Sequence, residues 1–243
     1  MIKTVGVLIA LVALASCQTY VDTTSPPTLT VFAAASLQPT FDRIAGQAHV
    51  DARFNYAGTQ TLTVQLTDGA QGDVFASADT THMTTVQNAG LIAGTPQVFA
   101  HNRLEIAVAK GNPKVIHSLA DLARNGLVVV LADPSVPAGK YAQQALAKAG
   151  VTVKPASLEL QVTAVLNKVA LGEADAGIVY VSDVSTSAKV DGIAIPDNQN
   201  VVADYPIAAL KNAQHKGTAD AFIRFVLSPD GQSILKAAGF EPA

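Results

Sequence analysis

The chain has 243 residues, of which 14% are charged and 49% hydrophobic, and its formal net charge is −3. This length allows one large domain or two smaller ones, and the composition excludes a disordered chain. A negative net charge and the absence of tryptophan argue against binding to nucleic acid or to an anionic membrane surface. A small buried anion is compatible with this charge, since it needs only a few local hydrogen-bond donors.

The first sixteen residues are predicted to be a signal peptide. Lys3 precedes an apolar run, Val5 to Ala15, that is too short to span a bilayer comfortably. The run leads into Leu14-Ala15-Ser16-Cys17, which resembles the lipobox of bacterial lipoproteins, and Cys17 is the only cysteine. The resemblance implies cleavage before Cys17 and lipid, palmitate included, on that residue. Residues 17–28 are polar and contain two prolines, and they are predicted to be a flexible tether.

The next part of the chain alternates short strands with helices. A strand from Leu29 to Phe32 leads through three alanines to Ser36, the expected N-cap of a helix that ends near Gln47. A strand over residues 49–56 ends before Gly58-Thr59, where a second helix is expected to begin. A third strand and a third helix follow. This rhythm is typical of a parallel sheet covered by helices.

The same rhythm starts again after residue 103, without an evident sequence repeat. Strands are predicted at residues 103–110, 127–131 and 177–181, and helices at residues 118–124, 140–148 and 162–171, with tail helices at 218–227 and 231–238. The extended stretches 103–107 and 201–210 are candidates for carrying the chain between two lobes. A double crossing of this kind makes a hinge, with a ligand cleft between the lobes.

We therefore predict an α/β fold with two lobes, each a mostly parallel sheet flanked by helices, joined by a two-strand hinge. Residues 29–104 together with 206–243 are expected to form the first lobe. Residues 105–205 are expected to form the second. The signal peptide (residues 1–16) and the lipidated tether (residues 17–28) precede both.

The candidate site residues lie at strand-to-helix turns or strand ends, which gather at the carboxyl edge of an open α/β sheet. Together they offer neutral hydroxyl and backbone N–H donors. They are Ser36 and Gly58-Thr59-Gln60 in the first lobe, and Pro137-Ala138-Gly139, the helix start near Val162, and Tyr180 in the second. Neutral donors and helix N-termini suit a fully ionised oxyanion such as sulfate, molybdate or tungstate. Asp133 and Glu159 are candidates for nearby acceptors, which would weaken that selection.

Catalytic and metal-ion motifs are not found in the sequence. The five histidines are scattered without metal-ligand spacing, so we expect no site for a bare metal cation. No GxSxG, P-loop or GxGxxG motif occurs, so Ser36 has no recognisable nucleophile setting. We expect no cofactor, no catalytic residue and no enzymatic activity.

Five segments in order resemble the periplasmic molybdate-binding proteins of ABC importers. They are VFAAASLQPTF, AGTQTL, GDVFASAD, VPAGKYAQQAL and AGIVYVSD, and the resemblance runs from about Leu29 to Phe240. It implies a type II periplasmic binding protein that captures molybdate or tungstate and delivers it to an ABC permease. With the lipobox, it implies a lipid-anchored protein on the extracytoplasmic face of the cell membrane. We expect a monomer.

The resemblance also implies which residues hold the anion. The implied set is Ser36, Thr59, Ala138, Val162 and Tyr180. Family members often carry consecutive serines where this chain has Gly58-Thr59-Gln60, so whether Thr59 or Gln60 donates is left open. Val162 is carried over by its position in a weaker motif.

Two alternatives stay open at this point. One is a binding protein for sulfate or another tetrahedral oxyanion. The other is an enzyme on the same two-lobe scaffold, such as a transferase or hydrolase, which would need a titratable group poised in the cleft. The motif-bearing turns offer none. The sequence does not separate molybdate from tungstate.

Overall fold

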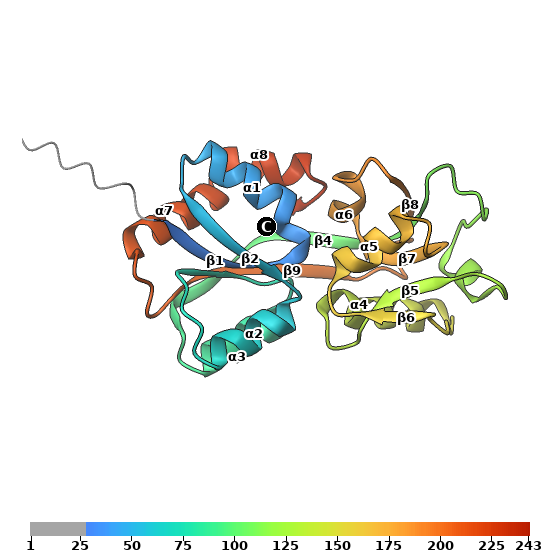
Figure 1. Ribbon diagram of the computed structural model, residues 1–243, viewed down its shortest axis with the longest axis horizontal. Helices are drawn as coiled ribbons and strands as arrows, with labels where there is room; N and C mark the ends of the chain where they lie inside the picture. Colours follow the sequence, from blue (N-terminus) through green and yellow to red (C-terminus); the bar gives the residue numbers. More distant parts are fainter. Residues whose placement is uncertain (1–27) are drawn as a thin grey trace, which may run out of the picture.

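A computed structural model describes residues 28–243 of the chain. The signal peptide and Cys17 lie outside the described residues. Figure 1 shows two α/β lobes connected by long strands that pass from one lobe to the other. Within the described residues, no helix is long and apolar enough to cross a membrane.

The first lobe is built on a sheet with the strand order β2-β1-β3-β9-β4. Its strands are β1 (Leu29–Ala34), β2 (Ala52–Ala57), β3 (Val74–Ala76), β9 (Val202–Leu210) and the first part of β4 (Ile92–Ala109), with β10 (Glu241–Pro242) paired to β4. The first three strands are mutually parallel, and β9 is antiparallel to β3. Its helices are α1 (Gln38–Gln47), α2 (Thr59–Thr67), α3 (Thr80–Asn88), α7 (Lys216–Leu227) and α8 (Pro229–Ala237).

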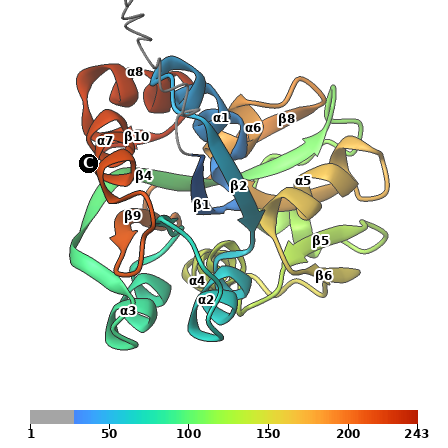
Figure 2. The ribbon, with the colours of Figure 1, turned by 60° about the vertical axis from the view of Figure 1, so that its left-hand side comes forward.

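The tail returns to the first lobe, as the double crossing predicts. Phe41 of α1 packs against Phe99 of β4 and Phe222 of α7, with ring centroids 5.6 Å apart in both pairs. All three side chains are fully buried. In Figure 2 the tail helices α7 and α8 lie on the same side of the sheet as α1. These aromatic contacts therefore fix the C-terminal helices to the beginning of the chain.

The second lobe continues the sheet in the order β4-β7-β5-β6, with β8 paired to β4. Its elements are η2 (Leu119–Ala123, a 3₁₀ helix), β5 (Val129–Ala132), α4 (Pro137–Ala149), β6 (Ser157–Glu159), α5 (Val162–Ala170), β7 (Ala176–Tyr180), α6 (Val181–Ser185) and β8 (Val190–Ala194). Strands β5 and β7 are buried along their whole length, as expected for parallel strands covered on both faces.

The hinge consists of β4 and β9. Strand β4 pairs with β9 from Ile92 to Arg103 and with β7 and β8 from Leu104 onward, so it belongs to the sheets of both lobes. The predicted α/β fold, with two lobes that are each a mostly parallel sheet flanked by helices, is confirmed. We propose lobe boundaries at residues 104/105 and 205/206, which fall inside β4 and β9.

Several element boundaries differ from the predictions. Ser36 is not an N-cap: β1 continues to Ala34 because the alanines keep pairing with β2, and a 3₁₀ turn, η1 (Ala35–Leu37), precedes α1. Helix α4 begins at Pro137 rather than Lys140, because proline suits the first helical turn. Strand β2 begins at Ala52, after His49 has adopted a positive φ of 52°.

Candidate functional site

The five predicted site residues lie around one small cavity between the lobes. Its lining consists of Ala34, Ala35, Ser36, Ala57, Gly58, Thr59, Ala78, Val136, Pro137, Ala138, Val162 and Tyr180. The five predicted residues are buried, each with 4% or less of its surface exposed. The structure thus brings together residues that are separated by up to 144 positions in the sequence, from Ser36 to Tyr180.

Helix starts converge on this cavity. The turn η1 contains Ser36, α2 begins at Thr59, α4 begins one residue before Ala138, and α5 begins at Val162. None of these four elements has a side-chain hydrogen bond at its N-cap. Their first N–H groups are therefore available to a ligand, and the positive ends of the helix dipoles favour an anion there.

Two hydroxyl groups are set up to donate into the cavity. The Thr59 Oγ1 accepts a hydrogen bond from the Ala78 N–H at 3.2 Å, so its own proton is left for another partner. The Tyr180 hydroxyl is buried and has no hydrogen-bond partner in the described part of the chain. Burial raises the pKa of Tyr180 well above its ordinary value, so this hydroxyl stays protonated. A buried donor without a partner indicates that a ligand completes the site.

The lining contains no charged side chain. Asp133 and Glu159, the two candidates for nearby acceptors, both bond to partners outside the cavity. Asp133 accepts hydrogen bonds from the backbone N–H and the hydroxyl of Ser135, and these bonds lower its pKa. Glu159 pairs with Lys168 at 2.6 Å, which lowers its pKa. Neither residue lines the cavity, so the cavity polar groups are neutral donors.

The lobes are closed over the cavity. Gln60 Nε2 donates to the Leu160 carbonyl oxygen at 2.7 Å, and Lys140 Nζ donates to Thr81 Oγ1 at 3.1 Å, both from one lobe to the other. Gly58 lies so close to the Leu160 carbonyl that a Cβ would overlap it. Figure 2 shows the end of β2 in the first lobe beside α5 in the second. Because Gln60 bridges the lobes and does not line the cavity, the geometry favours Thr59 as the donor.

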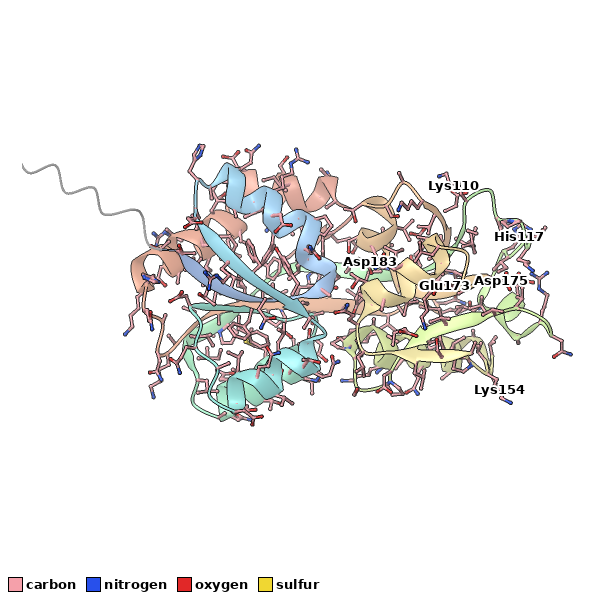
Figure 3. The ribbon with its side chains drawn as sticks, in the orientation of Figure 1. Lys110, His117, Lys154, Glu173, Asp175 and Asp183 are labelled. Carbon is pink, nitrogen blue, oxygen red and sulfur yellow. The ribbon has the colours of Figure 1, made fainter. Side chains whose placement is uncertain are left out.

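Sequence reasoning missed two buried residues beside the cavity. Tyr205 of β9 places its hydroxyl 3.0 Å from Ser36 Oγ. Asp183 of α6 accepts a hydrogen bond from the Tyr180 N–H at 3.0 Å, and burial raises its pKa to about 7. Figure 3 places Asp183 on the side of the second lobe that faces the first, whereas Lys110, His117 and Lys154 lie toward its outer end. Asp183 belongs to the AGIVYVSD segment, but a surface acid and a buried one are indistinguishable in sequence.

Comparison with known proteins connects this geometry to a family. The family model described as bacterial extracellular solute-binding protein matches residues 29–241. The chain belongs to this family. Among the relatives of this solute-binding protein is the molybdate-binding protein ModA of Mycobacterium tuberculosis. It is 47% identical over 218 residues, which cover 87% of this chain and 84% of the relative. The resemblance to molybdate-binding proteins that the sequence motifs indicated is confirmed.

Solved structures show the same fold at lower identity. The periplasmic molybdate-binding protein of Azotobacter vinelandii superposes on the solute-binding protein with a TM-score of 0.79 at 23% identity, covering 88% of this chain and 99% of that one. The sulfate-binding protein SubI of Mycobacterium tuberculosis gives a TM-score of 0.78 at 19% identity, covering 89% and 87%. The fold alone therefore does not separate the two anions.

Proposed function

We propose that this solute-binding protein captures molybdate or tungstate between its two lobes and delivers the anion to the membrane permease of an ABC importer. The supporting observation is the closed cavity, in which neutral hydroxyl and backbone N–H donors from both lobes converge and no charged side chain takes part. Such donors, together with helix N-termini, stabilise a fully ionised tetrahedral oxyanion without a counter-charge. The 47% identity to a molybdate-binding protein favours this ligand.

Sulfate is the second candidate ligand. SubI, which has the same fold, is a sulfate-binding protein, and sulfate is also a tetrahedral dianion that takes donors at every oxygen. Sulfate is smaller than molybdate, so a rigid set of donors discriminates between the two by cavity size. The higher identity to molybdate-binding relatives places molybdate first.

Capture takes place without covalent chemistry. Among the cavity-lining residues the one titratable side chain is Tyr180, whose raised pKa keeps it a neutral donor and not a base. A hydrolase or transferase needs a general acid or base within reach of the ligand. We therefore propose a binding protein and not an enzyme. The residues that we propose to hold the anion are Ser36, Thr59, Ala138, Val162 and Tyr180. We also propose that the protein acts as a monomer.

Ser36→Ala is expected to weaken molybdate binding by about 1.5–3 kcal/mol, the range for a hydrogen bond to a charged group. Isothermal titration calorimetry measures the change. Ser233→Ala, which removes an exposed hydroxyl from α8, is the matched control and should bind like the wild type. Wild-type affinity in Ser36→Ala would place the anion elsewhere.

Cys17→Ser is expected to release the protein from the membrane fraction, because the proposed lipid anchor is attached to the only cysteine of the chain. Fractionation of cells producing the wild type and the variant, followed by immunoblotting, measures the distribution. The soluble variant should retain wild-type affinity for the anion, since the tether precedes the described lobes. Retention of Cys17→Ser in the membrane fraction would rule out this anchor.

A further inference from the structure

Asp79 carries a buried carboxylate oxygen that has no hydrogen-bond partner. Asp79 is the N-cap of α3, and only 1% of it is exposed. Its Oδ1 accepts a hydrogen bond from the His82 N–H and lies 2.9 Å from His82 Nδ1, which fixes the orientation of the carboxylate. Its Oδ2 is buried as well and accepts from no group in residues 28–243. Because buried polar atoms are normally paired, this oxygen needs a donor.

Helix α4 of the second lobe approaches this carboxylate. In Figure 1, α4 lies at the edge of the second lobe that faces α2 and α3. Lys140 Nζ donates to Thr81 Oγ1 at 3.1 Å, so the beginning of α4 touches the beginning of α3. Tyr141, the next residue, is half-buried. Burial, together with the charges of Asp79 and Asp204, raises the pKa of Tyr141 above its ordinary value, so both carboxylates lie near its hydroxyl.

Of these two carboxylates, Asp79 gains more from a donor. Asp204 of β9 is 46% exposed and lies 2.8 Å from His101 Nδ1, so its oxygens are served by a side chain and by water. Asp79 Oδ2 has neither. A hydrogen bond from Tyr141 to Asp204 would replace a bond to water, whereas a bond to Asp79 would satisfy an unpaired buried acceptor, which costs about 1–3 kcal/mol when left alone.

Both residues are adjacent in sequence to the anion cavity. Asp79 follows Ala78, which lines the cavity, and Tyr141 lies in α4 three residues after Ala138. The first N–H groups of α4 are among the proposed anion contacts, so an anion in the cavity attracts the start of α4 toward the first lobe. The same movement carries the Tyr141 hydroxyl toward Asp79.

We propose that Tyr141 is a positioning residue that donates to Asp79 Oδ2 when the lobes close on the anion, and that it thereby holds α4 against α3. The bond joins groups of opposite lobes, so opening the cleft breaks it. It therefore slows release of the anion more than it speeds capture. The inference rests on the proposed function and adds the contact that keeps the cleft closed.

Tyr141→Phe tests this role because it removes the hydroxyl and keeps the ring. Binding of radiolabelled molybdate gives the association rate, and a chase with unlabelled molybdate gives the release rate. We expect release to become about tenfold faster, with the association rate changed by less than about twofold. Urea unfolding without molybdate should give the wild-type free energy of unfolding. Tyr56→Phe is the matched control, since the Tyr56 hydroxyl donates to Asp42 at 2.8 Å within the first lobe.

Double-mutant cycles identify the acceptor and the donor. Asparagine is as good an N-cap as aspartate, so Asp79→Asn keeps the start of α3 and removes the charge. Tyr141→Phe should accelerate release less in the Asp79→Asn background than in the wild type, and equally in the Asp204→Asn background. Lys140 is the other donor on this turn of α4. Lys140→Met should show no coupling to Asp79→Asn, because the ammonium donates to Thr81.

Wild-type release from Tyr141→Phe would overturn the inference, and so would coupling to Asp204→Asn instead of Asp79→Asn. Coupling of Lys140→Met to Asp79→Asn would name Lys140 as the donor and overturn it as well. A ligand-free Tyr141→Phe protein that loses as much stability as affinity would show a structural role only. All these results leave the proposed function intact. If the wild type bound no tetrahedral oxyanion, the proposed function would fail, and the inference with it.

Discussion

Gly58→Ala is expected to weaken molybdate binding by roughly one to two orders of magnitude without disturbing the first lobe. Gly58 has φ −57° and ψ 138°, a conformation that alanine adopts readily. In the closed structure, however, a Cβ at this position overlaps the Leu160 carbonyl oxygen of the opposite lobe and the Gln60 amide that donates to it. Relieving such an overlap costs about 1–3 kcal/mol, and the cost applies only when the lobes close.

Titration calorimetry gives the affinity, and small-angle X-ray scattering with and without molybdate reports whether the lobes close. The matched control is Gly46→Ala in α1, where a Cβ meets no atom within 4 Å, and it should bind like the wild type. A Gly58→Ala protein that binds and closes normally would show that the contact between Gly58 and Leu160 is not part of the ligand-bound state.

Asp183→Asn is expected to remove a pH dependence from the stability of the protein. The Asp183 carboxyl is buried, and burial raises its pKa from 3.8 to about 7 in the folded state. The folded protein therefore binds this proton more tightly than the unfolded chain does. The contribution of this proton to the free energy of unfolding is full below the pKa that Asp183 has in the unfolded chain, and it is lost as the pH rises from about 4 through about 7. Its upper limit is on the order of 4 kcal/mol.

Asparagine keeps an oxygen that can accept from the Tyr180 N–H but carries no charge at any pH. Urea unfolding at pH 5 and pH 8 should show a smaller loss of unfolding free energy for Asp183→Asn than for the wild type. Asp68→Asn, which removes an exposed carboxylate at the end of α2, is the control and should follow the wild type. Equal pH dependence in the wild type and Asp183→Asn would mean that Asp183 is ionised without cost in the folded protein.

Local sequence patterns predicted the fold, and they selected five residues that the structure brings to one cavity, because both depend on strand-to-helix turns. The turns at Ser36, Thr59 and Ala138 are marked by small residues, glycine and proline, and the parallel topology then places them at one edge of each sheet. Tyr180 ends a buried strand and is placed by the same rule.

Tertiary contacts set the features that the sequence did not predict. Ser36 looked like an N-cap, but its hydroxyl bonds to Tyr205, 169 positions later, and no local pattern contains that contact. The first part of β4 was missed because many residues between Ile92 and Val98 are exposed and do not alternate regularly. The role of Gln60 depends on a carbonyl of the opposite lobe and appears only when the lobes are closed.

Binding of tetrahedral oxyanions by the wild-type protein tests the central proposal most directly. Isothermal titration calorimetry with molybdate, tungstate, sulfate and phosphate compares a common shape at different sizes and protonation states. We predict that molybdate and tungstate bind tightly, that sulfate binds more weakly because it is smaller, and that phosphate binds most weakly because it carries a proton. Sulfate binding as tight as molybdate binding would contradict the proposed selectivity, and no binding of any of the four would contradict the function itself.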